Sequence, residues 1–426
     1  MKKSKYNYLV SRGENQSLLF NTRNHALVEL DDETLKNYCN DALDSNVIPT
    51  MSEFGFLIED GVDELQEIEG EYEKACANPS QMKLTIMTTE RCNFRCPYCY
   101  QDHGAKDMTL EKADILCEFL KKTYKNQTHT VDLSWFGGEP LLNVEPIFRV
   151  ERLIKEWDFG GYSHITTNGF LLTDAILERF RQETRISSIQ ITLDGTEEQH
   201  NATRCHMSGQ PTYKVICNNI QQAVAKGFFV TIRLNLNKIN QNMDSFFEDL
   251  EHLHLDKTKY TVHITNAHNF ECSEKLKNFY FETAEEYSQA YSKAQNSFTR
   301  AGYRFPRNLT KNVGCGFECN NVFLVGCDLT LYFCSSCELS DYFKQGYIDI
   351  NGNLHVNENY EKRRDVSAFK DDECRNCIVL PMCIGGCTYC RIKGNKHCIP
   401  EKFILEEYIV KLYNETENQG GQRTDL

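Results

Sequence analysis

Three closely spaced cysteines restrict what this chain can fold into more than any other feature. Cys92, Cys96 and Cys99 lie in the segment Cys-Asn-Phe-Arg-Cys-Pro-Tyr-Cys, directly after an apolar-alternating run at residues 82–87. Such a run predicts a strand, so the cysteines are expected on the loop that leaves its carboxyl end. Three thiolates on one loop suit a four-iron cluster, because cysteine sulfur is the usual protein ligand of these irons. Two alternatives stay open: a zinc loop that lacks one ligand, and buried free thiols.

These cysteines, with the aromatic Tyr98, resemble the signature of radical S-adenosylmethionine (SAM) enzymes. Three ligands leave one iron of the [4Fe-4S] cluster open, and in that family SAM chelates this iron through its amino and carboxylate groups. An electron from the cluster then cleaves a carbon–sulfur bond of SAM and releases a 5′-deoxyadenosyl radical, which abstracts a hydrogen from substrate. The resemblance therefore implies an enzyme whose difficult chemistry belongs to its cofactor, while the protein positions the reactants and excludes water.

The composition is typical of a globular protein with two or three domains. The chain has 426 residues and a net charge of −14, which disfavours nucleic acid and anionic membranes as partners. No apolar run approaches membrane-spanning length, and the basic start lacks the apolar segment of a signal peptide. Twenty cysteines without an export signal favour a cytoplasmic location and metal ligation over disulfides.

Strands and helices are expected to alternate between residue 82 and about residue 270. The strand-like runs are 82–87, 130–135, 163–167, 189–193, 229–236 and 260–265. This alternation predicts an α/β fold of parallel strands joined by right-handed crossovers. Six such units match the open six-stranded parallel (β/α)6 partial TIM barrel that the resembled family uses, in which loops at the carboxyl ends of the strands carry the ligands.

Five segments are predicted along the chain. They are a small N-terminal β/α module at 1–80, a radical SAM core at 81–270, a helical connector at 271–312, a cysteine-rich extension with a terminal helix at 313–414, and a tail at 415–426. Two interpretations of the N-terminal module stay open, leader-peptide recognition and a cap that covers the barrel. Cys39 and Cys76 in this module are isolated in the sequence and are interpreted as buried thiols rather than ligands.

Glycine-rich and polar motifs follow the second, third and fourth predicted strands. Gly137-Gly138-Glu139-Pro140 matches the family's Gly-Gly-Glu-Pro motif, whose backbone and glutamate hold the SAM ammonium. Glycine permits close approach of backbone to a ligand, and a carboxylate suits a cation. The resemblance implies that hydroxyl and carboxylate groups after the later strands bind ribose, and that Arg204 binds the SAM carboxylate. The implied SAM-binding set is Gly137, Gly138, Glu139, Pro140, Thr167, Asn168, Thr192, Asp194, Arg204 and Arg233.

For Arg233, a structural role within the core is as compatible with the sequence as a contact with SAM. Polar residues within strands are often hydrogen-bonded to other protein groups. Family members more often have serine where Thr192 stands. The hydroxyl is retained in this chain, so the implied contact is retained too. No catalytic base is assigned from the sequence.

Eleven of the 20 cysteines lie between Cys315 and Cys398. The run Cys-x2-Cys-x5-Cys-x3-Cys that begins at Cys374 resembles the SPASM domain, a C-terminal extension that carries two auxiliary [4Fe-4S] clusters; a zinc site is the alternative. The resemblance implies one cluster on Cys315, Cys319, Cys334 and Cys387, and the other on Cys374, Cys377, Cys383 and Cys398.

The upstream ligand set departs from the family pattern, because Cys315 and Cys319 are only four residues apart. The glycine usually found five residues before the cysteine at Cys334 is Leu329 here. Three surplus cysteines could substitute as ligands: Cys327, Cys337 and Cys390. The assignment of the upstream set is therefore less specific than that of the quartet.

The combined motifs resemble radical SAM/SPASM maturases of ribosomally synthesised peptides (RiPPs). A product radical must lose an electron before a thioether or carbon–carbon crosslink closes, and an oxidised auxiliary cluster is a suitable acceptor. The implied partners are a precursor peptide and an electron donor such as flavodoxin or ferredoxin. One alternative is a sulfatase-type maturase of a protein partner, but that branch has an aspartate where Ser335 stands. A non-catalytic iron–sulfur or zinc binding protein is the other alternative.

Overall fold

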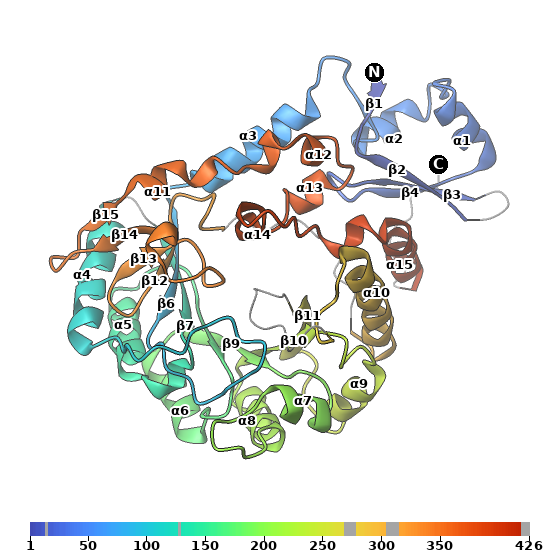
Figure 1. Cartoon of the computed structure of the whole chain (residues 1–426). Coiled ribbons are helices and arrows are strands. Elements are labelled where there is room, and N and C mark those ends of the chain that lie inside the picture. The colour runs from blue at the N-terminus through green and yellow to red at the C-terminus, as the bar shows by residue number, and fades with distance from the viewer. Residues whose placement is uncertain (13–15, 127–128, 268–277, 304–314, 419–426) are drawn as a thin grey trace.

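The computed structural model of the chain describes residues 1–12, 16–126, 129–267, 278–303 and 315–418 (Figure 1). Its largest feature is a ten-stranded sheet with the order β11-β10-β9-β8-β7-β6-β12-β13-β14-β15. Within the described residues, no helix is both long and apolar enough to cross a membrane.

Six neighbouring strands of this sheet are parallel and follow the order of the chain. They are β6 (Gln81–Met87), β7 (Thr130–Phe136), β8 (Ser163–Thr167), β9 (Ile186–Thr192), β10 (Phe229–Leu236) and β11 (Tyr260–Asn266). Each pairs in parallel with the next. The predicted α/β class with parallel strands is confirmed.

Helices cover the outer side of these strands, as Figure 1 shows. They are α4 (Leu110–Asn126), α5 (Glu145–Glu156), α6 (Asp174–Glu183), α7 (Glu197–Thr203), α8 (Tyr213–Ala225) and α9 (Asp244–Glu251). Alternate strand residues, such as Leu84, Ile86 and Trp135, are buried in the core beneath the helices. Because side chains alternate between the faces of a strand, the intervening polar residues point to the inner face.

The sheet is larger than the six strands expected from the sequence. Residues of the cysteine-rich extension add β12 (Val322–Val325), β13 (Thr330–Tyr332), β14 (Lys344–Ile348) and β15 (Leu354–Val356). β12 pairs in parallel with β6, while β13, β14 and β15 continue the sheet in antiparallel pairs. The short apolar run of β12 covers the edge of β6, which would otherwise present unpaired backbone groups.

The N-terminal region forms a three-stranded antiparallel sheet of β2 (Asn7–Ser11), β3 (Ser17–Asn21) and β4 (Leu27–Leu30). One set of its apolar side chains packs with α1 (Asp32–Cys39) and α2 (Ile48–Glu53). The other set packs with α15 (Leu405–Asn418), so the two ends of the chain share one core (Figure 1). A further two-stranded pair joins β1 (Lys2–Lys3) to β5 (Leu57–Ile58).

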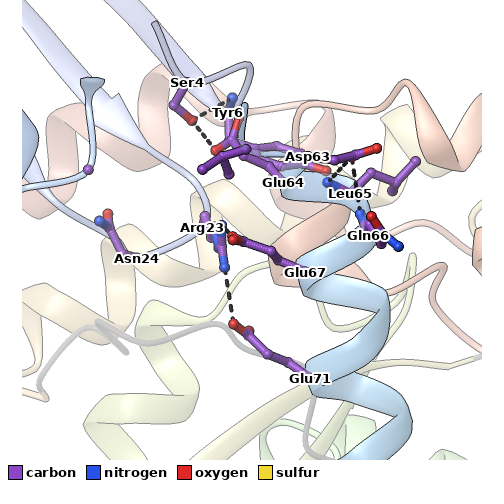
Figure 2. A network of polar contacts seen from close by, with 12 residues as sticks. Ser4, Tyr6, Arg23, Asn24, Asp63, Glu64, Leu65, Gln66, Glu67 and Glu71 are labelled. Atoms are coloured by element: carbon purple, nitrogen blue, oxygen red, sulfur yellow. Dashed lines mark hydrogen bonds and ion pairs between the residues drawn. The ribbon is translucent and has the colours of Figure 1, made fainter. Parts of the chain in front are cut away.

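Helix α3 (Glu64–Cys76) leads from this module to the main sheet. Polar contacts hold its N-terminal turns against the N-terminal module (Figure 2). Asp63 caps the helix by accepting hydrogen bonds from two backbone N–H groups in its first turn. Ser4 Oγ donates to Glu64 at 2.6 Å, and Arg23 forms ion pairs with Glu67 and Glu71 at 2.7 and 3.0 Å. The first strands and α3 are therefore joined by a connected polar network.

One long helix and several short elements follow β11 in the chain. They are α10 (Ala284–Arg300), α11 (Glu358–Glu361), α12 (Asp372–Arg375), α13 (Leu380–Cys383), α14 (Thr388–Ile392) and the 3-10 turn η6 (Pro400–Lys402). α3 packs against the C-terminal region, since Ile68 shares a core with Phe369 and Leu380.

Candidate active site

A cavity of about 340 Å³ lies on the inner face of the parallel strands, and we call it the strand-end cavity. All six parallel strands contribute polar side chains to its lining: Thr85, Ser134, Thr166, Gln190, Arg233 and Asn266. The volume is within the range of small-molecule sites. This is the location at which folds built from parallel strands bind their ligands.

The three cysteines of the first motif, Cys92, Cys96 and Cys99, all line this cavity. Burial raises the pKa of the Cys96 thiol to about 12, although the nearby Arg204 opposes the shift. Burial also raises the pKa values of the Cys92 and Cys99 thiols. Without a bound cation, these side chains are therefore neutral thiols at pH 7.

A single metal ion and an iron–sulfur cluster place different demands on the three thiols. Among the described residues, no group of three or more His, Cys, Asp or Glu side chains could hold one metal ion. An iron–sulfur cluster spreads its cysteine ligands over several irons. The three thiols line one cavity, as the ligands of such a cluster would, and the zinc alternative stays open for this loop.

Contacts with two later segments hold the cysteine loop in place. Arg95 N donates to the carbonyl of Cys205 at 2.7 Å, and Phe94 forms an isolated bridge with His206. The Phe94 ring is buried, and it packs edge-on against Phe170. The loop is therefore positioned by the chain around α7 as well as by β6.

The Gly-Gly-Glu-Pro segment packs backbone to backbone against the start of the cysteine loop. A Cβ on Gly137 would lie 2.5 Å from the carbonyl oxygen of Thr89, and one on Gly138 would lie 2.3 Å from that of Arg91. Gly137 also has φ 154, in the region that favours glycine. Both glycines line the strand-end cavity, so their backbone is available to a ligand.

Glu139 lies behind the cavity rather than in its lining. It is 0% exposed, and its carboxylate accepts hydrogen bonds from Thr167 Oγ1 at 2.7 Å, Asn168 N at 2.7 Å and Leu141 N at 3.0 Å. Burial raises the pKa of Glu139, but these donors oppose the shift. The glutamate therefore joins the segment after β7 to the end of β8, and its side chain is already occupied by protein donors.

Arg204 supplies a positive charge in the cavity lining. Its Nη1 donates to Tyr98 Oη at 3.1 Å, and Tyr98 in turn donates to Asp194. Burial disfavours the charged guanidinium, but the neighbouring Tyr98, Cys96 and Asp194 outweigh it and raise the pKa of Arg204. Its Nε atom is buried without a hydrogen-bond partner, so the site has an unused donor for an anionic ligand group.

Asp194 and Pro140, like Glu139, are absent from the lining. Asp194 Oδ1 accepts hydrogen bonds from Asn235 N at 2.9 Å and from Asn235 Nδ2 at 3.2 Å, so it supports the cavity from behind. The structure gathers the other predicted SAM-binding residues on the lining: Gly137, Gly138, Thr167, Asn168, Thr192, Arg204 and Arg233. Lining residues that the sequence did not single out include Gln190 and His103. Alternation along β9 would have suggested Gln190, whereas His103 lies in a loop without a motif.

Residues 86–253 match the Radical SAM superfamily. The chain contains a radical SAM domain. A radical SAM domain implies a [4Fe-4S] cluster and SAM. The three thiols, the close-packed glycine pair and the unpaired Arg204 Nε form a donor set that fits both groups.

Relatives of known activity include two kinds of radical SAM enzyme. The cysteine-type anaerobic sulfatase-maturating enzyme of Clostridium perfringens strain 13 is 23% identical over 368 residues, which cover 77% of this chain and 96% of the relative. The radical SAM cyclopropyl synthase TigE of Paramaledivibacter caminithermalis is 27% identical over 218 residues, or 42% of this chain and 46% of that protein.

Two groups of solved structures share the fold. Native anSMEcpe with bound AdoMet and a Kp18Cys peptide has a TM-score of 0.65 at 18% identity, covering 79% of this chain and 99% of that one. Streptococcus suis SuiB has a TM-score of 0.54 at 15% identity, covering 94% of this chain and 98% of that one. The predicted resemblance to radical SAM maturases is confirmed.

Four cysteines of the C-terminal quartet region meet at one place. Cys374, Cys377, Cys383 and Cys398 all line a small cavity of about 20 Å³. Lys396 and Lys402 also line it, and Lys402 Nζ lies 3.5 Å from Cys398 Sγ. Burial raises the pKa of the Cys374 thiol to about 11, although the nearby Lys396 opposes the shift. The structure thus brings together the four residues that the resemblance implied as one ligand set.

The upstream cysteines are arranged differently from the expected set. Cys315, Cys334 and Cys387 share an aromatic-rich core with the surplus Cys337 and Cys390. Leu329 has φ 68, so the backbone adopts the left-handed conformation for which the family uses glycine.

Cys319 faces away from that core, toward α3. Its thiol donates to Cys76 Sγ at 2.8 Å, and both residues are 3% exposed. Cys76 is isolated in the sequence but contacts another thiol in the fold, and the prediction that it is buried is confirmed. The same prediction for Cys39 is wrong, because that thiol is exposed at the end of α1. α3 crosses from the N-terminal module to the extension, which brings together two cysteines that are far apart in the sequence.

Proposed function

We propose that this chain is a radical SAM/SPASM maturase that oxidatively crosslinks a ribosomally synthesised precursor peptide through thioether or carbon–carbon bonds. One observation carries the proposal: the strand-end cavity extends from the three cysteines of the first motif to Ser335 and Ser336, which directly follow Cys334. The radical-generating centre and an auxiliary electron acceptor would therefore face the same substrate space.

The proposed roles follow from the positions of the side chains. Cys92, Cys96 and Cys99 would hold the cluster, Arg204 would bind the SAM carboxylate, and the backbone of Gly137 and Gly138 would accept the ammonium. When bound, the cluster and SAM supply a carbon-centred radical that abstracts hydrogen. The lining residues Thr167, Asn168, Thr192 and Arg233 would orient SAM, with Glu139, Pro140 and Asp194 supporting them from behind.

The proposal includes two auxiliary [4Fe-4S] clusters. Cys374, Cys377, Cys383 and Cys398 would hold one, and their shared cavity supports this assignment. Cys315, Cys319, Cys334 and Cys387 would hold the other, with Cys76 as a competing ligand because it contacts Cys319. An external reductant such as flavodoxin or ferredoxin would supply the electron that cleaves SAM. The auxiliary clusters would accept a different electron, the one that the product radical loses.

We propose that the chain is divided into the five segments predicted from the sequence, with boundaries after residues 80, 270, 312 and 414. The N-terminal module would bind the leader of the precursor, and the fold shared with SuiB over 94% of this chain supports a role within the maturase. A cap over the substrate space is the alternative. The open six-stranded barrel is likewise retained for the core, supported by six consecutive parallel strands.

A sulfatase-type maturase is the second candidate, because the relative from Clostridium perfringens covers most of this chain. The composition of the strand-end cavity favours the peptide maturase. Ser335 lies in its lining at the position where the sulfatase-maturing branch has aspartate, and none of the described lining residues is Asp or Glu. A proton acceptor of the carboxylate type is therefore missing from this lining.

Anaerobic reconstitution with iron and sulfide tests the proposal. The protein is expected to release 5′-deoxyadenosine from SAM when dithionite is added, and a co-expressed candidate precursor should lose the mass of two hydrogens per crosslink. Well-reconstituted protein that binds SAM but releases no 5′-deoxyadenosine would contradict an enzymatic role. Absence of SAM binding in calorimetry would favour the non-catalytic alternative.

A further inference from the structure

A second cavity, of about 410 Å³, lies between β11, α10 and the segment that follows α14. We call it the Glu401 cavity. Its lining includes the proposed cluster ligands Cys383, Cys387 and Cys398, and it shares Asn266 with the strand-end cavity. The two cavities therefore adjoin at the carboxyl end of β11.

Glu401 in η6 is an unusual carboxylate among the described residues. It is 3% exposed and lines the cavity, yet no hydrogen bond or ion pair in the described chain joins its carboxylate to another residue. The other buried acidic residues all accept hydrogen bonds: Glu64, Asp132, Glu139, Glu151, Asp194 and Glu318. The carboxylate of Glu401 is contacted by its own backbone N–H. A buried carboxylate with so little compensation is costly, so Glu401 lacks a contact to another residue that the others have.

The surroundings of Glu401 fit a positively charged partner. Tyr287 and Tyr291 of α10 line the same cavity, with ring centroids 5.7 Å apart and an interplanar angle of 38°. Among the described residues, no Lys or Arg contributes to this lining. A carboxylate beside two aromatic rings is an arrangement that binds ammonium and guanidinium groups.

We propose that the Glu401 cavity binds a basic side chain of the peptide substrate, with Glu401 as its counter-charge and Tyr287 and Tyr291 as its aromatic walls. This inference rests on the proposed function in taking the substrate to be a peptide, and it adds the chemical class of one substrate side chain. Because the cavity adjoins the strand-end cavity at Asn266, the basic residue would lie next to the modified residue or be that residue. Glu401 is thus a specificity-determining residue.

The ionisation of Glu401 agrees with this role. Burial raises its pKa to about 7, although the hydrogen bond from its own backbone N–H opposes the shift. A bound ammonium or guanidinium would stabilise the carboxylate and keep the group charged.

Ligand-observed NMR on the reconstituted full-length protein tests the proposal. The probes are the Nα-acetyl N-methylamides of lysine and arginine, with the norleucine compound as a neutral analogue of lysine. We expect a basic probe to bind roughly tenfold more tightly than the norleucine probe. The Glu401→Gln variant should reduce that preference to about twofold or less. Glu406→Gln, an exposed carboxylate in the next helix, is the matched control and should keep the preference.

A second variant separates recognition from misfolding. Tyr291→Leu keeps Glu401 but removes one aromatic wall, and it should weaken the basic probe several-fold without weakening the norleucine probe. Equal affinity of the basic and neutral probes for the unaltered protein would overturn the inference. SAM cleavage is measured in the same samples: normal cleavage with no preference refutes this inference alone, whereas absent cleavage counts against the proposed function.

Discussion

At the residue scale, the three thiols of the first motif are the groups on which the proposed chemistry most directly depends. Replacing Cys92, Cys96 and Cys99 together by alanine should remove about four irons from the reconstituted protein and abolish SAM cleavage, because these side chains would be the cluster's protein ligands. Iron analysis and 5′-deoxyadenosine release measure the two effects. Cys39→Ala is the control, since that exposed thiol ends α1, belongs to none of the proposed cluster or SAM sites, and should leave both unchanged. Retained cleavage in the triple variant would refute the assignment.

Substitution of Glu139 tests whether its hydrogen bonds, made outside the cavity lining, hold the SAM-binding residues in position. In Glu139→Gln, the amide NH2 would face a hydrogen-bond donor, either Thr167 Oγ1 or Asn168 N. We expect a loss of about 1–3 kcal/mol in the free energy of unfolding. SAM affinity in calorimetry should fall as well, because the ends of β7 and β8 would no longer be held together. An unchanged unfolding curve together with lost SAM binding would instead show that the glutamate contacts SAM itself.

Glu401 also gives the stability of the protein a definite pH dependence. The pKa of its carboxyl is raised by burial to about 7, above its ordinary value of 4.5. Because the folded pKa is raised, the folded state favours the protonated, neutral carboxyl more than the unfolded state does. The stability gained from this protonation is fully present below pH 4.5 and is lost as the pH rises through 7. Relative to Glu401→Gln, the unaltered protein should therefore lose roughly 3 kcal/mol between pH 4.5 and pH 8. Thermal unfolding of both proteins across this range measures the difference, and parallel curves would show that Glu401 is not desolvated.

At the element scale, local patterns were enough to locate the parallel strands. The runs at 163–167 and 229–236 coincide with β8 and β10, because period-two burial along a strand is visible in the sequence itself. The sequence did not predict β12. Its residue Val322 pairs with Lys83, which is far away in the sequence, and a run of four apolar residues does not indicate which strand it will pair with. Likewise, sequence spacing was enough to group four cysteines that line one small cavity, namely Cys374, Cys377, Cys383 and Cys398. The Cys76–Cys319 contact and the Glu401 cavity depend on long-range packing, which spacing does not show.

The contact between α3 and the loop before β12 leads to a test of the upstream ligand set. We expect Cys319→Ala to lose about four irons and Cys76→Ala to retain them, because Cys319 and not Cys76 belongs to the family spacing. Both thiols are equally buried, so each variant is a matched control for the other. The opposite result would assign a cluster ligand to α3 and link the N-terminal module directly to the extension.

At the scale of the whole molecule, the first and last parts of the chain stabilise each other. Val10, Leu18 and Phe20 of the N-terminal sheet pack against Tyr408 and Ile409 of α15. The domain boundaries predicted from the sequence put these two segments in different domains. A sequence pattern shows that one face of a strand or helix is apolar, but it does not show which other segment covers that face. The leader-binding module we propose is therefore built in part from the C-terminal helix.

This shared core allows leader binding and radical chemistry to be separated by a single substitution. Ile409 is fully buried, so Ile409→Ala should destabilise the N-terminal core by about 2–5 kcal/mol. Hydrogen exchange should then rise in β2 and β3, while exchange in β6–β11 stays unchanged because a different core holds those strands. Reductive SAM cleavage without peptide should persist, whereas peptide modification should require higher peptide concentrations. The exposed Glu406→Ala serves as control, and equal loss of SAM cleavage and peptide modification in Ile409→Ala would show that the N-terminal module supports the core instead of binding the leader.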